Sequence, residues 1–161
     1  MKEKIYLIRI IKWASLGALV FLMVLKFTGN RVSHSPMKKV QKETLKYVDA
    51  AKMQEGTPQM IKRLYGLSPK DFEGICLFYP KTNMGAEEVL IVKIKDVNRQ
   101  QDQVKKAVEK RLETQKKNFD GYGTYQYGML KQSRIVIKGN YILFISGKHP
   151  GKVEEAFLKA L

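Results

Sequence analysis

The sequence has 161 residues, of which 44% are hydrophobic and 28% charged, a composition typical of one folded domain. The formal net charge is +15, and residues 34–161 alone hold 24 Lys/Arg against 14 Asp/Glu, so the charge favours polyanionic partners. The single cysteine, Cys76, excludes an intramolecular disulfide framework and a zinc site built from several cysteines. Its apolar surroundings (ICLFY) predict a buried, unreactive thiol.

An apolar segment near the N-terminus predicts one transmembrane helix. Residues 13–25 (WASLGALVFLMVL) contain no charge, and the segment widens to residues 10–27 if Lys12 and Lys26 reach the two membrane interfaces. A helix of that length spans about 27 Å, close to the thickness of the hydrocarbon core. A cleavable signal peptide is the alternative, but the residues after the segment do not suit a cleavage site.

This anchor divides the chain into four parts. Residues 1–9 are a basic N-terminus, residues 10–27 the anchor, residues 28–39 a polar tether, and residues 40–161 the folded domain. Basic residues flank the anchor on both sides, so charge alone does not decide the orientation. We expect the simplest topology, a single-pass protein of the cell membrane with residues 1–9 in the cytoplasm and an extracytoplasmic domain.

The first half of the domain changes from helical to strand patterns. TPQMIKRLYG contains a full set of helix signals, with Thr57 as the N-cap, Pro58 in the first turn and Gly66 as the stop. Residues 75–79 (ICLFY) and 87–95 (EEVLIVKIK) are rich in strand-forming residues. A period of two in the second run predicts aliphatic side chains on one face and lysines on the other.

The second half predicts a helix, a hairpin and a final helix. A long amphipathic helix follows Asp96, with an apolar stripe that ends at Phe119. Gly139-Asn140 separates RIVIK from YILFIS, which predicts a two-residue hairpin turn, and a last helix begins near Pro150. The fold class is therefore α+β, an antiparallel sheet of about four strands with helices packed on it.

The sequence indicates no catalytic residue, metal ligand set or cofactor motif. The histidines, His34 and His149, are not accompanied by closely spaced Cys, Asp or Glu ligands. The carboxylates of Glu87-Glu88 are adjacent and so point apart on a strand, where we expect solvated positions. An enzyme is the less favoured class, and Asp120 beside Tyr122 is its first candidate site.

A tyrosine-rich stretch is the first candidate for binding. NFDGYGTYQYGML, residues 118–130, holds Tyr122, Tyr125 and Tyr127 in what its glycines predict to be a tight loop. Tyrosines in such a loop either stack on sugars and partner proteins or bury their rings in the core. Both alternatives stay open here.

The second candidate is GKHPGK, residues 147–152, which follows a strand and opens a helix. Lys148 and Lys152 beside unpaired backbone N–H groups could hold a phosphate or a carboxylate. The motif differs from a nucleotide-binding phosphate loop, because three residues separate its glycines and Val153 follows the second lysine.

Four short motifs follow one another along the chain: LYGL (64–67), AEEVLIVKIKD (86–96), RLETQKKNFDGY (111–122) and GNYILFIS (139–146). In this order and spacing they resemble a known family, the bacterial "domain of unknown function 4358" proteins of the Firmicutes envelope. The similarity covers residues 40–161 and implies an extracytoplasmic domain, but it brings no activity and no catalytic residues. Many members look like lipoproteins, whereas this chain has no lipid-bearing cysteine near its anchor.

The features together favour a membrane-anchored envelope accessory protein without catalytic activity. We expect its partner to be an anionic cell-wall polymer or another envelope protein, and we expect no nucleic acid and no cofactor. The alternatives are an envelope enzyme with an unrecognised site and a basic domain facing the cytoplasm that binds nucleic acid or anionic lipid.

Overall fold

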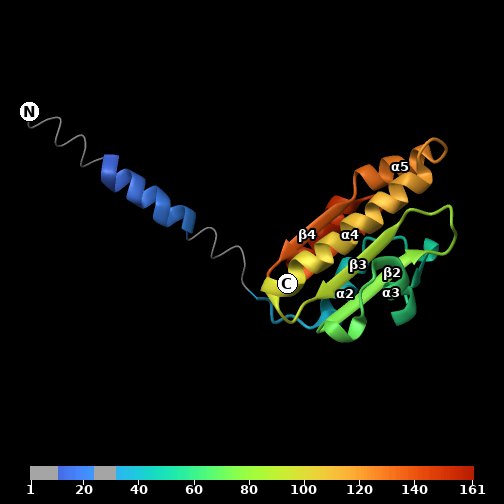
Figure 1. Ribbon diagram of the computed structural model, residues 1–161, viewed down its shortest axis with the longest axis horizontal. Coiled ribbons are helices and arrows are strands. Elements are labelled where there is room, and N and C mark those ends of the chain that lie inside the picture. The colour runs from blue at the N-terminus through green and yellow to red at the C-terminus, as the bar shows by residue number, and fades with distance from the viewer. Residues whose placement is uncertain (1–10, 24–31) are drawn as a thin grey trace, which may run out of the picture. The chain divides into compact units, whose positions relative to one another are not determined.

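The computed structural model describes residues 11–23 and 32–161, which belong to two compact units, residues 1–31 and 32–161 (Figure 1). In the first unit, residues 11–23 are helical. Within the described residues, no helix is both long and apolar enough to span a membrane. Residue 10 and residues 24–27 of the predicted anchor lie outside the described residues, as do residues 1–9 and 28–31.

The second unit alternates helices and strands. Its α-helices are α2 (Met37–Leu45), α3 (Pro58–Tyr65), α4 (Val97–Phe119), α5 (Thr124–Lys131) and α6 (Pro150–Ala160). Two short 3-10 helices, η1 (Ala50–Lys52) and η2 (Pro69–Asp71), lie between them. Its strands are β1 (Met53–Glu55), β2 (Gly74–Pro80), β3 (Glu88–Lys93), β4 (Arg134–Lys138) and β5 (Tyr141–Ser146).

The five strands form one antiparallel sheet in the order β1-β2-β3-β5-β4. Strand β3 therefore lies at the centre, paired with β2 on one side and β5 on the other. Its register pairs Leu90 with Leu77 of β2 and with Phe144 of β5. Every residue of β3 and β5 is buried, so both faces of these two strands are shielded from solvent.

Helices cover both faces of this sheet, so the domain has three layers (Figure 1). On one face, α3 and α4 pack against the side chains of Leu90, Val92 and Phe144. On the other face, α2 and α6 pack against Val89, Ile91 and Leu143. The side chains of β3 therefore contribute to two hydrophobic cores, because successive side chains of a strand point to opposite faces.

The cap and the stop that the sequence predicts for α3 are present, and α4 has a capped N-terminus as well. The hydroxyl of Thr57 accepts a hydrogen bond from the N–H of Met60, and Gly66 ends α3 with a left-handed φ of 68°. The carboxylate of Asp96 accepts hydrogen bonds from the first N–H groups of α4, at 3.0 and 3.3 Å. Each cap satisfies backbone groups that a helix terminus leaves unpaired.

The predicted hairpin is confirmed, and its register joins Lys138 directly to Tyr141. Gly139 has a φ of 58°, whereas Asn140 does not have a positive φ. One residue with positive φ therefore suffices for this two-residue turn, at the position where glycine carries no steric cost.

Three expectations differ from the structure. The sheet has five strands rather than about four, because the short edge strand β1 pairs with β2 from a segment that carries no strand pattern of its own. The stretch expected to be a tight aromatic loop continues as a helix, α5, after the turn at Gly121. The second face of β3 is covered by α2 and α6, so Lys93 is buried rather than in solvent.

The folded unit also begins earlier than residue 40. Residues 32–39 belong to it, and the N–H of Ser33 donates to Asn140 Oδ1 at 2.8 Å. The hydroxyl of Ser35 donates to the carbonyl of Ala160 at 2.9 Å, and the Tyr141 hydroxyl donates to the carbonyl of Ser35 at 2.7 Å. Partners more than a hundred residues away thus order a segment whose composition is typical of a tether.

Candidate functional site

Glu88 is the most deeply buried acidic side chain among the described residues, with 1% of its surface exposed. The sequence pattern predicted a solvated carboxylate here, and that prediction is wrong. The reason is the position of Glu88 at the start of the central strand. Side chains alternate along a strand, so Glu88 lies on the same face as Leu90 and Val92, the face that α4 covers. Its neighbour Glu87 points to the other face, and its carboxylate accepts the Ala86 N–H at 3.1 Å.

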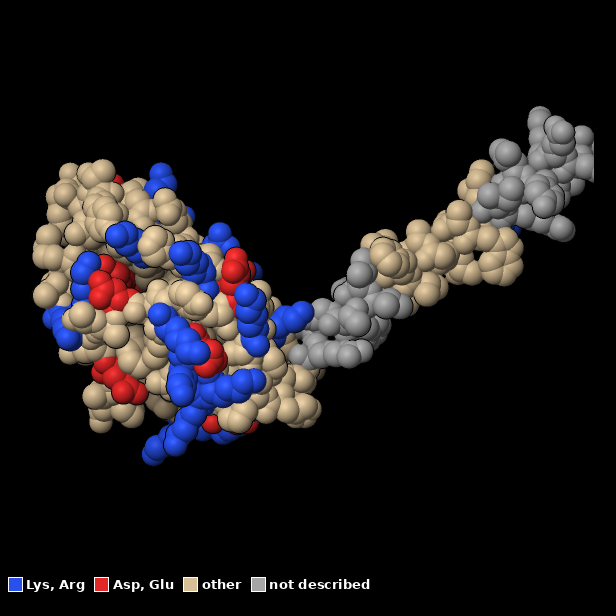
Figure 2. Space-filling model, turned by 180° about the vertical axis from the view of Figure 1, so that it is seen from behind, with Lys and Arg blue, Asp and Glu red and all other residues tan. Residues whose placement is uncertain are grey.

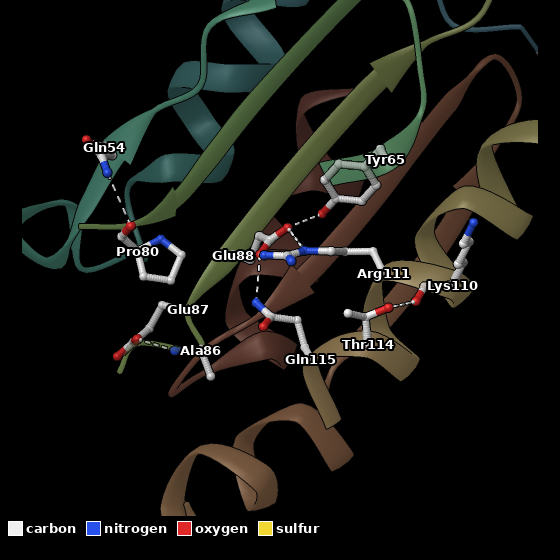
Figure 3. A network of polar contacts seen from close by, with 10 residues as sticks. All are labelled: Gln54, Tyr65, Pro80, Ala86, Glu87, Glu88, Lys110, Arg111, Thr114 and Gln115. Carbon is white, nitrogen blue, oxygen red and sulfur yellow. Dashed lines mark hydrogen bonds and ion pairs between the residues drawn. The ribbon is translucent and has the colours of Figure 1, made fainter. Parts of the chain in front are cut away.

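Three side chains satisfy the buried carboxylate (Figure 3). Arg111 of α4 donates from Nε at 3.1 Å and from Nη2 at 2.7 Å, a bidentate ion pair. Gln115, one turn further along α4, donates from Nε2 at 3.2 Å, and the Tyr65 hydroxyl of α3 donates to the other oxygen. A buried charge is tolerated when it is paired and hydrogen-bonded in this way.

The network also shifts the pKa values of its members. Burial raises the pKa of the Tyr65 hydroxyl well above its usual value, and the adjacent Glu88 charge raises it further. Burial acts to lower the pKa of Arg111, but the bonded Glu88 outweighs it and the pKa is raised. Tyr65 is therefore a hydrogen-bond donor at every physiological pH, and Arg111 stays charged.

Two adjoining hollows lie over this network, between α3 and α4, and together they form what we call the α3/α4 groove. Their volumes are about 360 and 390 Å³, and they share Arg63, Leu64 and Arg111. Five cations line them: Lys62, Arg63, Lys81, Lys110 and Arg111. Within the described part of the chain, no Asp or Glu lines either hollow.

The charged side chains of the groove lining could contact anions. Among the described residues, Lys62, Arg63 and Lys110 form no ion pair. The lining also contains four amide side chains and two tyrosines: Gln54, Asn83, Gln115, Asn118, Tyr65 and Tyr79. Cations donate to carboxylate or phosphate, and amides and a tyrosine suit sugar hydroxyls.

The opposite side of the domain differs in charge pattern (Figure 2). There, Lys and Arg side chains are interleaved with Asp and Glu. A hollow of about 460 Å³ between α2 and α6 contains Lys39 and Lys159, but also Glu43 and Glu155. The α3/α4 groove is therefore the more uniformly positive of the two.

The structure separates the predicted lysines and brings one of them to a predicted tyrosine. Lys148 and Tyr125 both line a small pocket of about 100 Å³ beside the end of β5. Lys152 instead lines the hollow between α2 and α6. The GKHPGK segment therefore contributes to two different surfaces.

The other predicted tyrosines do not join that pocket. Tyr122 is 67% exposed, and its ring lies 6.2 Å from the ring of Phe119. Tyr127 is half-buried against the small core around Phe119 and Met129, with Lys131 Nζ 5.5 Å from its ring centre. Core packing therefore accounts for Tyr127, one of the two alternatives that its sequence context left open.

The described residues contain no group of three or more His, Cys, Asp and Glu side chains that could hold a metal ion. Asp120 and Tyr122, the site considered for an enzyme, are both exposed in the turn between α4 and α5. The Ser146 hydroxyl is buried without a hydrogen-bond partner among the described residues, so it is not bonded to His149.

One comparison identifies the family. Residues 46–147 match the model of the family described as domain of unknown function DUF4358. The chain belongs to this family. No curated protein and no solved structure matches the chain.

The residues matched by the family model contain the α3/α4 groove. They include α3, α4 and the whole sheet, and with them Glu88, Tyr65 and every residue that lines the α3/α4 groove. They exclude α2 and α6, which line the hollow on the opposite face. The α3/α4 groove therefore belongs to the DUF4358 domain itself.

Residue order alone could not reveal the groove. Its cations come from α3, from the loop after β2 and from α4, three segments that the fold brings together. The one available signal was the acidic residue before the apolar run VLIV in the strand EVLIVK, together with a following helix rich in basic residues.

Proposed function

We propose that this protein is a membrane-anchored envelope accessory protein whose extracytoplasmic domain binds an anionic cell-wall polymer without catalysis. The observation that carries the proposal is the α3/α4 groove, which has five cations in its lining and no carboxylate among the described residues. A repeating anion could pair with several of these cations at once, and multiple weak contacts add up along a polymer.

The Glu88 network supports a binding role by fixing the floor of the groove. Arg111 is held by two hydrogen bonds and Gln115 by one, so both side chains are ordered before a ligand arrives. Such preorganisation lowers the entropy cost of binding. The uncharged segment 13–25 and the DUF4358 match support the membrane and domain parts of the proposal.

The polymer part is tested with the full chain in a mild detergent and purified bacterial cell walls. Walls with their phosphate polymer intact are compared with walls from which acid has extracted it. We expect retention on the intact walls alone, falling steeply as salt rises, because screening weakens exposed ion pairs. No retention at low salt would rule out the polymer, and a membrane-protein partner would then take its place.

A pair of variants separates the groove from charge in general. Arg63→Gln/Lys110→Gln removes two groove cations, whereas Lys42→Gln/Lys138→Gln removes two exposed lysines that do not line it. We expect the first variant to bind about tenfold more weakly, corresponding to about 1.4 kcal/mol, and the second to bind almost as the wild type. Equal losses would mean that binding follows net charge and not the groove.

The topology is tested by thiol labelling in intact cells. A Cys76→Ala/Lys42→Cys variant carries one exposed thiol on α2 and none in the core. Labelling by a membrane-impermeant reagent in intact cells is the expected result. Labelling only after lysis would place the domain in the cytoplasm and favour nucleic acid or anionic lipid as the partner.

A further inference from the structure

The two edge strands of the sheet, β1 and β4, differ in how far they are protected from pairing with another strand. Strand β1 has only three residues, and proteins commonly block an edge by keeping its strand short. Strand β4 has five residues (RIVIK), with charges only at its two ends and a continuous register with β5. The centre of β4 therefore lacks the charge, proline or bulge that usually blocks an edge.

The register shows which backbone groups β4 leaves unpaired. The N–H of Ile94 donates to the carbonyl of Asn140 at 2.8 Å, so the even-numbered residues of β5 bond to β3. Because bonding alternates in antiparallel strands, the odd-numbered residues of β5 bond to every second residue of β4, starting with Arg134. The N–H and C=O groups of Ile135 and Ile137 therefore point away from the sheet. Among the described residues, no hydrogen bond reaches them.

These unpaired groups complement those of a second copy of the chain. When two β4 strands run antiparallel about a twofold axis at Val136, Ile135 of each copy lies opposite Ile137 of the other. All of the outward N–H and C=O groups then pair, in four backbone hydrogen bonds. The aliphatic side chains of residues 135–137 are half-buried in one copy, and the other copy would cover them further. The contact uses the same surface on both copies, as twofold interfaces do.

The apolar surface of this edge continues onto α6. Glu154 of α6 forms an ion pair with Arg134 of β4, so this side of α6 lies beside the edge strand. Leu158 is one turn further along the same side of the helix and is 41% exposed. A second copy would therefore add its own Leu158 to the contact that its β4 strand makes.

The charges at the ends of β4 are compatible with a second copy because of Glu154. The twofold register places Arg134 opposite Lys138 of the other copy, and two like charges alone would disfavour pairing. Glu154 uses its Oε2 atom for Arg134, and among the described residues its Oε1 atom has no partner. That free oxygen is available to the Lys138 ammonium, so one carboxylate can lie between the two cations at each end.

The arrangement also suits two chains anchored in one membrane. The Ser33 hydroxyl donates to the carbonyl of Leu161 at 2.9 Å, at the end of α6. A twofold axis perpendicular to the sheet leaves the α2/α6 faces of both copies on the same side. The Ser33 segments of both copies therefore lie on one face of the pair, and this point alone rests on the proposed anchor.

We infer that two copies of this protein pair edge to edge through β4, so that two five-stranded sheets join into one continuous antiparallel sheet. The contact is independent of polymer binding, because no residue of β4 lines the α3/α4 groove. The occupant of the edge is thus a second copy, held by backbone bonds at Ile135 and Ile137 and by aliphatic contacts around Val136.

Site-specific crosslinking of the full chain in mild detergent tests the register. In Cys76→Ala/Val136→Cys, the new thiols of two copies lie opposite each other on the twofold axis, with Cα atoms about 4.5 Å apart, a separation that a disulfide can bridge. The control, Cys76→Ala/Lys138→Cys, places a more exposed thiol on the same face, where the two copies of residue 138 are about 13 Å apart.

We expect mild oxidation to link the Val136→Cys chains about tenfold faster than the Lys138→Cys chains, because only the first pair lies within disulfide reach. Equal rates would mean random collision and would overturn the inference. Contact through the N-terminal segments alone would not favour position 136 over position 138, so the comparison separates it from pairing through β4.

Two substitutions break the contact in different ways. Ile137→Pro removes an outward N–H and leaves the bonds to β5 in place, and Val136→Lys places two lysines against each other on the twofold axis. Near-ultraviolet circular dichroism checks that each variant is folded. Sedimentation equilibrium in density-matched detergent measures self-association, which we expect to weaken about tenfold or more in both variants and to stay unchanged in Lys42→Gln on α2.

A wild-type chain that is monomeric at every concentration would overturn the inference, and so would two folded variants that associate as the wild type does. In the first case, an extended segment of another protein would be the remaining kind of partner for this edge. Retention of single chains on cell walls does not require β4, so a failure of pairing is distinguishable from a failure of polymer binding.

Discussion

The two faces of the sheet bury ionisable groups in different ways. On the α3/α4 face, Glu88 is enclosed and receives hydrogen bonds from Tyr65, Arg111 and Gln115. On the α2/α6 face, the 10% exposed side chain of Lys93 pairs at 2.6 Å with Glu73, whose side chain is 51% exposed. The enclosed charge depends on protein partners alone, whereas the second pair is partly solvated and water can replace a lost partner.

The largest effect is expected on the α3/α4 face. Glu88→Gln keeps the shape of the side chain but leaves the Arg111 guanidinium, whose side chain is 12% exposed, without its counter-charge. Breaking one partner of a buried ion pair costs about 3–5 kcal/mol. Urea unfolding of the full chain in detergent, followed by near-ultraviolet circular dichroism, measures the loss.

A double variant tests the reason for that loss. Glu88→Leu/Arg111→Leu removes both charges at once, and we expect it to recover most of the stability, because an apolar pair carries no desolvation penalty. If the double variant is no more stable than Glu88→Gln, the cost arises from packing or from the Tyr65 and Gln115 donors left without an acceptor, and not from an uncompensated charge.

A smaller effect is expected from the thiol on the α2/α6 face. Burial raises the pKa of Cys76 to about 12, from an ordinary value of 9.0. The folded state therefore keeps its proton where the unfolded state loses it, so stability is present below pH 9 and is lost as the pH rises toward 12. Between pH 9 and 10 the loss from this group is about 1 kcal/mol.

The matching measurement compares the pH dependence of unfolding in the wild type and in Cys76→Ala. The variant should be less stable at pH 8 because it loses packing, but its stability should fall less between pH 9 and 10. Parallel curves for the two proteins would mean that the thiol does not titrate with unfolding.

The smallest effect is expected at the solvated pair. Glu73→Gln removes the partner of Lys93, yet half of the Glu73 side chain is already in water and the Lys93 ammonium also lies 5.6 Å from the centre of the Tyr141 ring. We expect a loss of about 1 kcal/mol, because the Glu73 end of the pair is exposed and water there can replace the lost carboxylate at the Lys93 ammonium. A loss as large as that of Glu88→Gln would remove the distinction between the two faces.

Short sequence signals predicted correctly the helix ends and turns that depend on interactions between neighbouring residues. The Thr57 cap, the Gly66 stop and the Gly139 turn are each set by a few neighbouring residues, and each is present. The apolar stripe of α4 likewise matches its buried side chains, among them Val104 and Val108. Expectations failed where the decisive partner is distant in sequence, as for β1 and for the segment from Ser33 to Ser35.

The candidate sites follow the same division. The excess of positive charge, the buried Cys76 and the DUF4358 resemblance could be read from residue order, because composition and short motifs carry them. Only the tertiary structure placed Glu88 beneath Arg111, collected five cations in one groove and brought Tyr125 to Lys148. The reason is that strand pairing and helix packing join residues far apart in sequence, and whether a charge is buried depends on which element covers it.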